Sequence, residues 1–235
     1  MSETLTITTP DGAFSAYVAR PPAALAATPA PAIVVIQEIF GVNKVMRDVC
    51  DALAAQGFVA VCPDLFWRIE PGIDITDHSE AEWKKAFELY NAFDVDAGVS
   101  DIATTLAAVR ALPSVNGKVG AVGYCLGGLV AFLTATRTDA DASVSYYGVG
   151  TEKHVGEAEK LARPLLMHIA EEDQFVPKEA QKVILDALKD HPQIEIHTYP
   201  GRDHAFARVG GAHYDATDAG RANARSLAFF KSNLG

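Results

Sequence analysis

The sequence predicts an α/β protein with a mostly parallel central sheet and helices on both faces of that sheet. Three observations predict this class. Predicted strands and helices alternate along most of the chain. The run Ala32–Gln37 is almost wholly apolar, as a strand that is buried on both faces should be. The glycine-rich segment Gly123–Gly128 stands between an apolar strand and an apolar helix, which is a junction typical of such sheets.

The elements of the first half follow from turn signals and periodicity. Two short strands, Thr4–Thr8 and Phe14–Ala19, flank the turn Pro10–Gly12 and predict a hairpin. A connector rich in Pro and Ala (21–31) leads to the strand Ala32–Gln37. Next come a helix over Asn43–Gln56 ended by Gly57, a strand over Phe58–Cys62 stopped by Pro63, a loop over 64–78, and two helical stretches. The second stretch has one apolar face, formed by Val95, Val99, Ile102, Leu106 and Val109.

The second half continues the alternation. After the strand that includes Lys118–Val122, a helix covers Leu129–Leu133. Three further strands are predicted at Ala142–Tyr147, Pro164–Ile169 and Gln193–Tyr199. A helix spans Pro177–Asp190, with Pro in its first turn, and another spans Thr217–Leu234, with Thr217 as its expected N-cap. Ligands of such sheets bind at the carboxyl ends of the strands, so the segments that follow the strands are the place to look for a site.

Composition limits the classes of partner and compartment. The chain has 235 residues, 49% of them hydrophobic, which suits one domain over residues 1–235. The net charge of −10, with no block rich in Lys and Arg, argues against nucleic acid. No apolar run reaches the roughly 18 residues of a membrane helix, and residues 1–10 lack the core of a signal peptide. Cys50, Cys62 and Cys125 form no paired framework and no metal-ligand spacing, so we expect a reducing cytoplasm, two core thiols and no metal.

The strongest functional signal is Gly123-Tyr124-Cys125-Leu126-Gly127-Gly128. In a nucleophile elbow, small residues flank a strained strand-to-helix turn that lifts the nucleophile above the sheet. Cys125 stands at the nucleophile position, and the backbone N–H of Leu126 can face a developing oxyanion. The alternative is a buried structural cysteine beside a glycine-rich strand end.

The matching acid and base should follow later strands. Asp173 follows Pro164–Ile169, and His204 follows Gln193–Tyr199, which gives the chain order nucleophile, acid, base that α/β-hydrolases use. Glu171 or Glu172 could be the acid instead, or all three carboxylates could belong to a solvated loop. Among the other histidines, His168 lies in a strand and is expected in the core, whereas His154, His191 and His213 are expected at the surface.

Several motifs together carry a resemblance. They are Gln37–Asn43, Cys62–Leu65, Ala92–Asp94, Gly117–Gly120 with Gly123–Gly128, Tyr146–Gly150, Asp173–Pro177 and His204–Arg208. With these motifs the chain resembles the dienelactone hydrolase family, the carboxymethylenebutenolidases, which have the α/β-hydrolase fold.

The resemblance implies a role for particular residues. Cys125, Asp173 and His204 would form a triad, and Glu38 would be a switch carboxylate that contacts the resting thiol and helps deprotonate it when substrate arrives. The backbone N–H groups of Ile39 and Leu126 would form the oxyanion hole. Arg208 would bind a substrate carboxylate, with Tyr147 and Phe175 lining the pocket.

Some of these residues have other interpretations. Glu38 could simply emerge into solvent after its strand. Arg208 could be a surface residue that pairs with Asp203 or Asp215.

One position departs from the family pattern. Well-known members carry a second carboxylate-binding Arg on the helix that precedes the Ala-Phe-Asp stretch, and Trp83 stands at that position here. Arg68, or the adjacent Lys84 or Lys85, could substitute for it. An aromatic residue at this position favours an apolar or planar substrate group.

These observations predict a hydrolase that opens a lactone through a cysteinyl ester, the leading substrate being a dienelactone-type butenolide that gives maleylacetate. The expected partner is a small lactone or ester that carries a carboxylate. Neither a cofactor, a metal, nucleic acid nor a membrane is expected, and the protein would be a monomer or small homo-oligomer. The alternatives are a general hydrolase of small esters or thioesters that uses the same triad, and a non-enzymatic protein that senses redox state through Cys125.

Overall fold

The computed structural model describes residues 3–23 and 29–235, so part of the predicted connector lies outside the described residues. The chain divides into two compact units, Met1–Ala121 (unit 1) and Val122–Gly235 (unit 2). The strands form an eight-stranded sheet in the order β1-β2-β4-β3-β5-β6-β7-β8, and β5 (Val115–Tyr124) contains the boundary between the units. The predicted α/β class with a mostly parallel sheet is confirmed, and a single domain over residues 1–235 stays a prediction.

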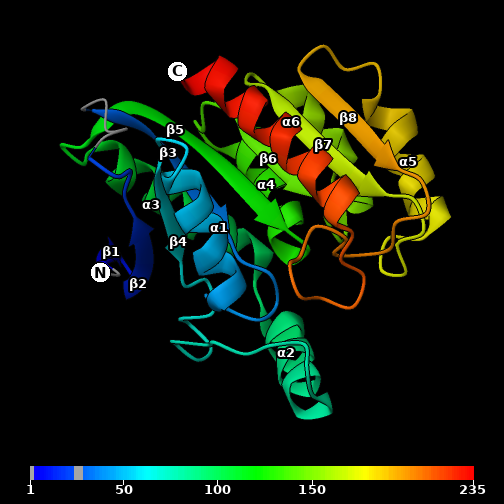
Figure 1. Cartoon of the computed structure of the whole chain (residues 1–235), viewed down its shortest axis with the longest axis horizontal. Coiled ribbons are helices and arrows are strands. Elements are labelled where there is room, and N and C mark those ends of the chain that lie inside the picture. Colours follow the sequence, from blue (N-terminus) through cyan, green and yellow to red (C-terminus); the bar gives the residue numbers. More distant parts are fainter. Residues whose placement is uncertain (1–2, 24–28) are drawn as a thin grey trace. The chain divides into compact units, whose positions relative to one another are not determined.

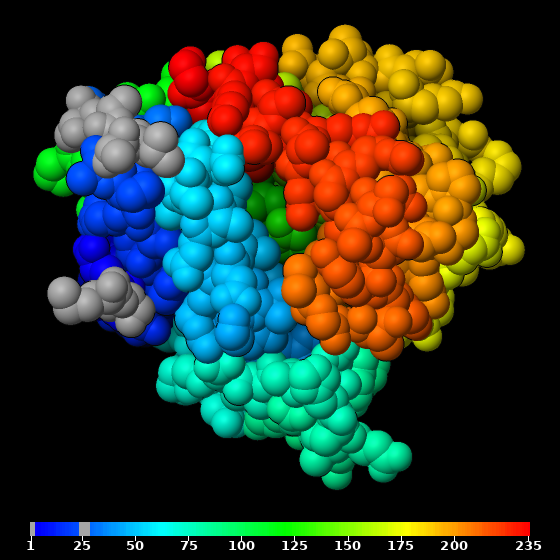
Figure 2. All heavy atoms as spheres, viewed as in Figure 1, coloured from blue at the N-terminus to red at the C-terminus, as the bar shows by residue number. Residues whose placement is uncertain are grey.

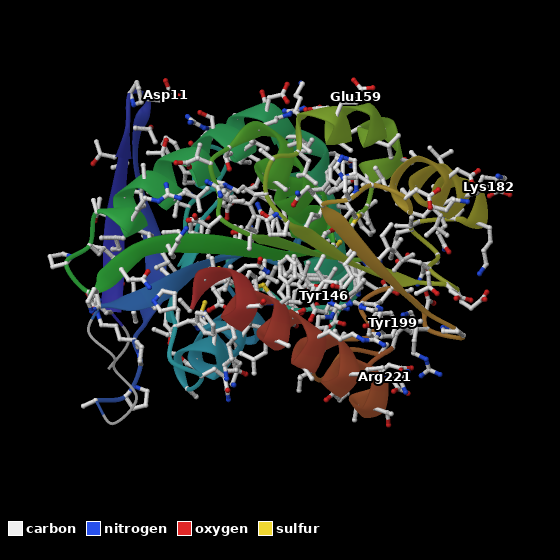
Figure 3. The ribbon with its side chains drawn as sticks, turned by 90° about the horizontal axis from the view of Figure 1, so that it is seen from above. Asp11, Tyr146, Glu159, Lys182, Tyr199 and Arg221 are labelled. Atoms are coloured by element: carbon white, nitrogen blue, oxygen red, sulfur yellow. The ribbon has the colours of Figure 1, made fainter. Side chains whose placement is uncertain are left out.

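Unit 1 begins with the predicted hairpin, in which β1 (Glu3–Thr9) and β2 (Gly12–Ala19) pair antiparallel. Its other elements, besides most of β5, are β3 (Ala30–Ile36), α1 (Lys44–Ala54), β4 (Val59–Pro63), α2 (Glu80–Ala92) and α3 (Val95–Arg110). Strands β3 and β4 are parallel and almost wholly buried, because α1 and α3 cover opposite faces of them (Figures 1 and 3).

The core of unit 1 matches the apolar pattern of the sequence. Val99, Ile102, Leu106 and Val109 of α3 are buried, whereas Val95 in the first turn is only half-buried. Cys50 on α1 and Cys62 on β4 are both fully buried, as predicted, and they are hydrogen-bonded to each other. Asn43 caps α1 by accepting the backbone N–H of Met46, which explains why the helix begins at Lys44.

Unit 2 contains the remaining elements, beginning with α4. They are α4 (Leu126–Arg137), β6 (Ser143–Tyr146), the 3-10 turns η1 (Thr151–Lys153) and η2 (Val155–Lys160), β7 (Leu165–Ala170), α5 (Lys178–Leu188), β8 (Ile194–Tyr199) and α6 (Ala216–Leu234). Strands β6, β7 and β8 are parallel. Helices α4 and α5 lie on one face of these strands and α6 lies on the other (Figures 1 and 3).

The final helix corrects one prediction. The sequence predicts Thr217 as its N-cap, but α6 begins at Ala216 and Asp215 is the capping residue. The Asp215 carboxylate accepts the backbone N–H of Asp218 at 2.9 Å. Asp is as good a cap as Thr and stands two residues earlier, so the helix gains part of an extra turn. Together with the segment 200–215, α6 (orange to red) forms a large part of the surface of unit 2 that Figure 2 shows.

Candidate active site

Cys125 lies at a strained strand-to-helix turn, as a nucleophile elbow requires. Its backbone has φ 57° and ψ −118°, outside the regions that a side-chain-bearing residue normally occupies, and it directly precedes α4. The turn is held by its own backbone: the N–H of Cys125 donates to the carbonyl of Tyr146 at 3.1 Å, and its carbonyl accepts the N–H of Gly128 at 2.9 Å. Strain of this kind persists only where surrounding structure fixes it, and it is common at functional sites.

The glycines around Cys125 are required by close backbone packing. A Cβ atom on Gly123 would lie 1.8 Å from the carbonyl oxygen of Gly127, and one on Gly128 would lie 2.4 Å from the carbonyl oxygen of Tyr146. Gly148, after β6, is equally close to α4, since its Cβ would lie 2.8 Å from the backbone of Gly128. The first turn of α4 therefore sits directly against the ends of β5 and β6.

His204 is held by a buried carboxylate. Its Nδ1 atom lies 2.8 Å from Oδ2 and 3.0 Å from Oδ1 of Asp173, and both side chains are almost completely buried. Nδ1 therefore donates its proton to Asp173, which leaves Nε2 free to act as the base. The buried Nε2 atom has no oxygen or nitrogen partner among the described residues. Its hydrogen-bonding neighbour is the thiol of Cys125.

Asp173 is itself fixed by the loop that carries it. Its Oδ1 atom accepts the backbone N–H groups of Phe175 and Val176 at 2.8 and 3.1 Å. The two alternative acids lie elsewhere: Glu172 pairs with Lys178 at 3.0 Å on the surface, and Glu171 has no contact with His204 among the bonds of the described residues. Of the three candidate carboxylates, Asp173 is therefore the one that is bonded to the imidazole of His204.

The electrostatics of His204 match this arrangement. Burial lowers the pKa of His204, but the charge of Cys125, hydrogen bonds to Asp173 and Cys125, and the charge of Asp173 together raise it to about 10. An imidazole with such a pKa keeps its proton whenever the neighbouring thiol is ionised. The pair is therefore suited to exist as thiolate and imidazolium once the thiol proton has moved.

Aromatic side chains surround the His204 ring. The Tyr147 ring meets it edge-on at 5.0 Å, and the Phe175 ring does so at 4.9 Å. Phe175 is 38% exposed, whereas Tyr147 is buried. Tyr147 has a positive φ of 40°, and its backbone N–H donates to the carbonyl of His168 at 2.8 Å. Both predicted pocket residues therefore lie next to the predicted base.

Arg208 lies one turn beyond His204 in the segment between β8 and α6. Its backbone N–H donates to the carbonyl of Ala205 at 2.9 Å, and its side chain packs over Gly211, where a Cβ would lie 2.8 Å from Nε. In the alternative interpretation, Arg208 pairs at the surface with Asp203 or Asp215. Both of these acids have other partners. Asp215 is bonded to Arg202, and Asp203 accepts the backbone N–H groups of Gln174 and His204.

In unit 1, the predicted switch carboxylate and oxyanion amide follow β3. Glu38 is 2% exposed and Ile39 is 5% exposed, so the alternative that Glu38 emerges into solvent is wrong. The preceding Gln37 is also buried, and its Oε1 atom accepts the backbone N–H of Leu65 at 3.1 Å. A buried carboxylate at the carboxyl end of a strand is costly unless it is compensated, which marks Glu38 as a residue with a specific purpose.

Trp83 lies on α2 in a stack of aromatic rings. Its ring contacts Phe40 edge-on at 5.1 Å and stacks on Phe87 at 5.6 Å, and its indole N–H donates to the carbonyl of Asp77. Phe40 is buried but Phe87 is 41% exposed, so the stack runs from the segment after β3 to the surface of α2.

Two of the three proposed substitutes for a second Arg, Arg68 and Lys85, have other partners. Arg68 binds Asp11 and the buried Asp101, each at 2.9 Å, and covers the ring of Trp67. Lys85 is paired with Glu70, and Lys84 is exposed. At position 83 itself, α2 carries Trp, a side chain that is aromatic and uncharged.

Two residues near the site had weak sequence signals. Asp203 accepts the backbone N–H groups of both Gln174 and His204, and so it ties the loop of the acid to the loop of the base. Phe206 is fully buried against Tyr147, with ring centroids 5.7 Å apart. The Gly-x-Asp-His pattern could have identified Asp203, whereas nothing in the pattern distinguished Phe206 from an ordinary core residue.

The remaining histidines sort by exposure. His168 is 1% exposed and lies in the core, as predicted. His213 is exposed, whereas His154 and His191 are half-buried. Among residues 3–23 and 29–235, no group of three or more His, Cys, Asp or Glu side chains is arranged to hold a metal ion. In the same ranges, no helix is long and apolar enough to cross a membrane.

The sheet order and the Cys125 elbow define an α/β-hydrolase. The dienelactone hydrolase family model matches residues 14–234. A protein of Azospirillum brasilense is 54% identical over 228 residues, covering 96% of each chain. The carboxymethylenebutenolidase of Pseudomonas putida is 41% identical over 230 residues, covering 97% of this chain and 96% of the relative. A crystal structure from Klebsiella pneumoniae, 28% identical, has a TM-score of 0.85 and covers 98% of both chains.

The chain therefore belongs to the dienelactone hydrolase family, as the motifs of the sequence indicated. It is an enzyme, a hydrolase that acts on carboxylic ester bonds.

Proposed function

We propose that this protein opens a lactone through a cysteinyl ester on Cys125, with His204 as base and Asp173 as the residue that orients it. The observation that carries the proposal is the buried pair of His204 and Asp173, joined through Nδ1 at 2.8 Å, beside a cysteine at a strained elbow. A buried structural cysteine needs neither the positive φ nor an oriented imidazole next to it.

The reaction has two halves. The Cys125 thiolate attacks the acyl carbon of the lactone, and the backbone N–H groups of Leu126 and Ile39 stabilise the oxyanion. The ring opens when the C–O bond breaks. An alkoxide leaving group takes the proton that Cys125 gave to His204, whereas an enolate leaves as the anion and His204 keeps that proton until the thiolate is released. Water, deprotonated by His204 or by the enolate, then attacks the thioester, which releases the carboxylic acid and restores the thiol. This sequence consumes one water and needs no oxidant, metal or organic cofactor.

Glu38 is proposed as the trigger of the thiol. A free thiol has a pKa near 8.5, so a cysteine enzyme needs a way to form the thiolate at the right moment. A carboxylate such as buried Glu38 would oppose a standing thiolate by repulsion, and it would suit a thiol that stays neutral until substrate binds. A neutral resting thiol is also less easily oxidised.

The substrate is proposed to be a dienelactone-type butenolide, which gives maleylacetate, in the degradation of aromatic compounds in the cytoplasm. The relatives named carboxymethylenebutenolidase support this assignment, and so does Arg208, which offers a planar fork for a substrate carboxylate. Tyr147 and Phe175 would line the pocket. Trp83 would face an apolar or planar substrate group. Because Trp83 stands where a second carboxylate-binding Arg is expected, the lactone-opening reaction is better supported than the dienelactone as the particular substrate.

The second candidate function is a general hydrolase of small esters or thioesters that uses the same three residues. The uncharged aromatic stack of Trp83 and Phe87 favours it, because it offers no second cation for a dicarboxylic substrate. Faster turnover of neutral p-nitrophenyl esters than of carboxylated lactones would decide for this candidate. A purely redox-sensing protein is the third possibility, and an acyl adduct on Cys125 would exclude it.

Replacement of the nucleophile tests the proposal. Cys125→Ala should lower kcat by on the order of 10³-fold or more and leave the fold intact. Mass spectrometry of wild-type protein quenched during turnover should find the acyl group on Cys125. Cys50→Ala is the matched control, since it also removes one thiol, and its folded fraction should keep wild-type turnover. Near wild-type turnover by Cys125→Ala would rule out the mechanism.

A further inference from the structure

Six side chains form a continuous hydrogen-bonded chain between α6 and the ends of β6, β7 and β8. We call this chain the α6 relay. Its members, in order, are Arg225, Tyr199, His168, Ser226, Tyr146 and Asn223. Its middle is buried and its two ends reach the surface: Tyr146, His168 and Tyr199 are at most 1% exposed, whereas Arg225 is half-buried and Asn223 is exposed. Figure 3 shows labelled Tyr146 and Tyr199 beside α6.

Every bond of the α6 relay has ordinary length. Arg225 Nη1 donates to the Tyr199 hydroxyl at 3.1 Å, and that hydroxyl lies 2.8 Å from Nδ1 of His168. Nε2 of His168 lies 2.9 Å from Oγ of Ser226. The Ser226 hydroxyl lies 2.7 Å from the hydroxyl of Tyr146.

The last bond runs from the Tyr146 hydroxyl to Oδ1 of Asn223 at 2.9 Å. The relay thus begins at a group that only donates, the Arg225 guanidinium, and ends at a group that accepts, the Asn223 carbonyl oxygen.

These two ends fix the direction of every proton between them. Because Arg225 donates to the Tyr199 oxygen, the Tyr199 proton points to Nδ1 of His168, which must be unprotonated. His168 then carries its proton on Nε2 and donates it to Ser226. The hydroxyl of Ser226 donates in turn to Tyr146, and Tyr146 donates to Asn223. Each hydroxyl gives one hydrogen bond and receives one, so the buried polar groups are all satisfied only when His168 is neutral.

The charges around His168 agree with this assignment. Burial lowers the pKa of His168 well below its usual value, and the neighbouring His197 and Arg225 lower it further. The His197 ring stacks on that of His168 at 6.0 Å, and no carboxylate contributes to the shift. A protonated His168 would leave the Tyr199 hydroxyl proton without an acceptor among its two partners, because Arg225 can only donate. The relay is therefore built for one tautomer of one charge state.

Two contacts connect the α6 relay to the surroundings of His204. The backbone carbonyl of His168 accepts the N–H of Tyr147 at 2.8 Å, in a residue whose positive φ needs outside support. The Tyr199 ring packs on Phe206 at 4.6 Å. Tyr147 in turn contacts both Phe206 and His204, with ring centroids 5.7 and 5.0 Å away. Tyr147, which packs on the imidazole of His204, is thus held both by the backbone of His168 and, through Phe206, by Tyr199.

We propose that His168 is a positioning residue for His204: its neutral Nε2–H tautomer locks the α6 relay, and the relay holds Phe206, which packs on Tyr147, so that Tyr147 stays against the catalytic imidazole. This inference rests on the proposed function, because it assigns a purpose to the position of His204. It differs from a purely structural role, since loss of the relay should impair the reaction of Cys125 even in protein that is fully folded.

The first experiment reads the tautomer directly. Nitrogen-15 NMR of labelled protein should show His168 neutral, with its proton on Nε2, throughout the pH range 5 to 9. It should stay so in Cys125→Ala, which makes this readout independent of the proposed reaction. A His168 that carries its proton on Nδ1, or that becomes protonated within this range, would overturn the assignment and with it the proposal.

The second experiment removes one hydroxyl at a time. Tyr199→Phe keeps the ring on Phe206 and breaks the link between Arg225 and His168, and Ser226→Ala breaks the link at Nε2. Each should lower kcat by about tenfold and change KM less, because His204 is displaced by a fraction of an ångström while Arg208 and Phe175, two of the proposed substrate contacts, are not members of the relay. Tyr17→Phe is the matched control, since it removes a tyrosine hydroxyl bonded to Asp51 at 2.8 Å in unit 1, and its kcat should not change.

The third readout needs no substrate and separates the two proposals. The rate of Cys125 alkylation as a function of pH reports the thiol–imidazole pair, and its midpoint should shift in Tyr199→Phe and Ser226→Ala but not in Tyr17→Phe. Unchanged kcat and alkylation profile in folded relay variants would overturn the positioning role. Should Cys125→Ala retain turnover, the proposed function fails instead, whatever the relay variants do.

Discussion

The substitution Asp173→Asn is the sharpest test of how the site works, because it changes one atom in a group with three defined partners. Oδ1 of Asp173 accepts two backbone N–H groups, from Phe175 and Val176, and Oδ2 lies 2.8 Å from Nδ1 of His204. In the variant the amide oxygen must stay with the two backbone donors, since an NH2 group there would face N–H groups. The NH2 group therefore replaces Oδ2 and points at the imidazole.

This orientation reverses the histidine. Nδ1 must now accept a hydrogen bond from the introduced amide, so the proton of the neutral ring moves to Nε2, the nitrogen that should take the thiol proton of Cys125. A base in the wrong tautomer costs about 10⁴-fold in kcat in a comparable triad, which corresponds to about 5.5 kcal/mol. The pKa of His204 should also fall from about 10, because the hydrogen bond and charge of Asp173 help to raise it.

Single-turnover acylation, followed by release of the first product, measures this effect. Asp203→Asn is the matched control: its carboxylate accepts the backbone N–H groups of His204 and Gln174, and the amide oxygen that replaces it can still accept both. The Asp203→Asn variant should keep the acylation rate within a few-fold of wild type, because both backbone hydrogen bonds remain. Acylation by Asp173→Asn within tenfold of wild type would refute the assignment of Asp173 as the orienting group.

Three further outcomes are expected. Glu38→Gln should slow acylation by lactone while substrate binding changes much less, and an unchanged single-turnover rate would refute the trigger role. Arg208→Ala should lower kcat/KM for a carboxylated lactone by roughly 2–4 kcal/mol and leave neutral esters almost unchanged, so equal losses on both would refute the clamp. The hydrogen bond from Arg137 lowers the pKa of Glu157 from 4.5 to about 2, so this pair stabilises the fold above pH 4.5 and less as pH falls toward 2. Arg137→Gln should accordingly cost about 1 kcal/mol in urea unfolding at pH 7 and less at pH 3.

The sequence predicted the mostly parallel sheet because its strands and helices depend on local patterns. Burial on both faces makes β3 nearly continuous in apolar residues, and a period of three to four residues marks the buried face of α3. The glycines around Cys125 also have a local cause, since a Cβ on Gly123 would collide with the chain four residues later. Helix ends follow less directly from the sequence: Asp215 and Thr217 are both good caps, and only the fold decides between them.

Partners that come from distant parts of the chain could not be predicted from local patterns. Asp203 holds Gln174 by its backbone across 29 residues, and Ser226 meets Tyr146 across 80 residues. The spacing of these residues along the sequence does not predict such contacts. His168 was correctly expected in the core, but the sequence carried no sign that both of its ring nitrogens would be bonded, or that α6 would supply one of the partners.

Cys125 and His204 are held in place by different kinds of interaction. Cys125 holds a backbone conformation that costs on the order of 1–3 kcal/mol, and it cannot relax because Gly123 and Gly148 bring neighbouring backbone to within contact. Cys125, the proposed nucleophile, is thus positioned by packing, which does not depend on charge or pH. His204, in contrast, is positioned by hydrogen bonds that depend on protonation, through Asp173 directly. Under the proposed mechanism, substrate would change the charge state of the pair while the sulfur stays in place, as a triggered thiol requires.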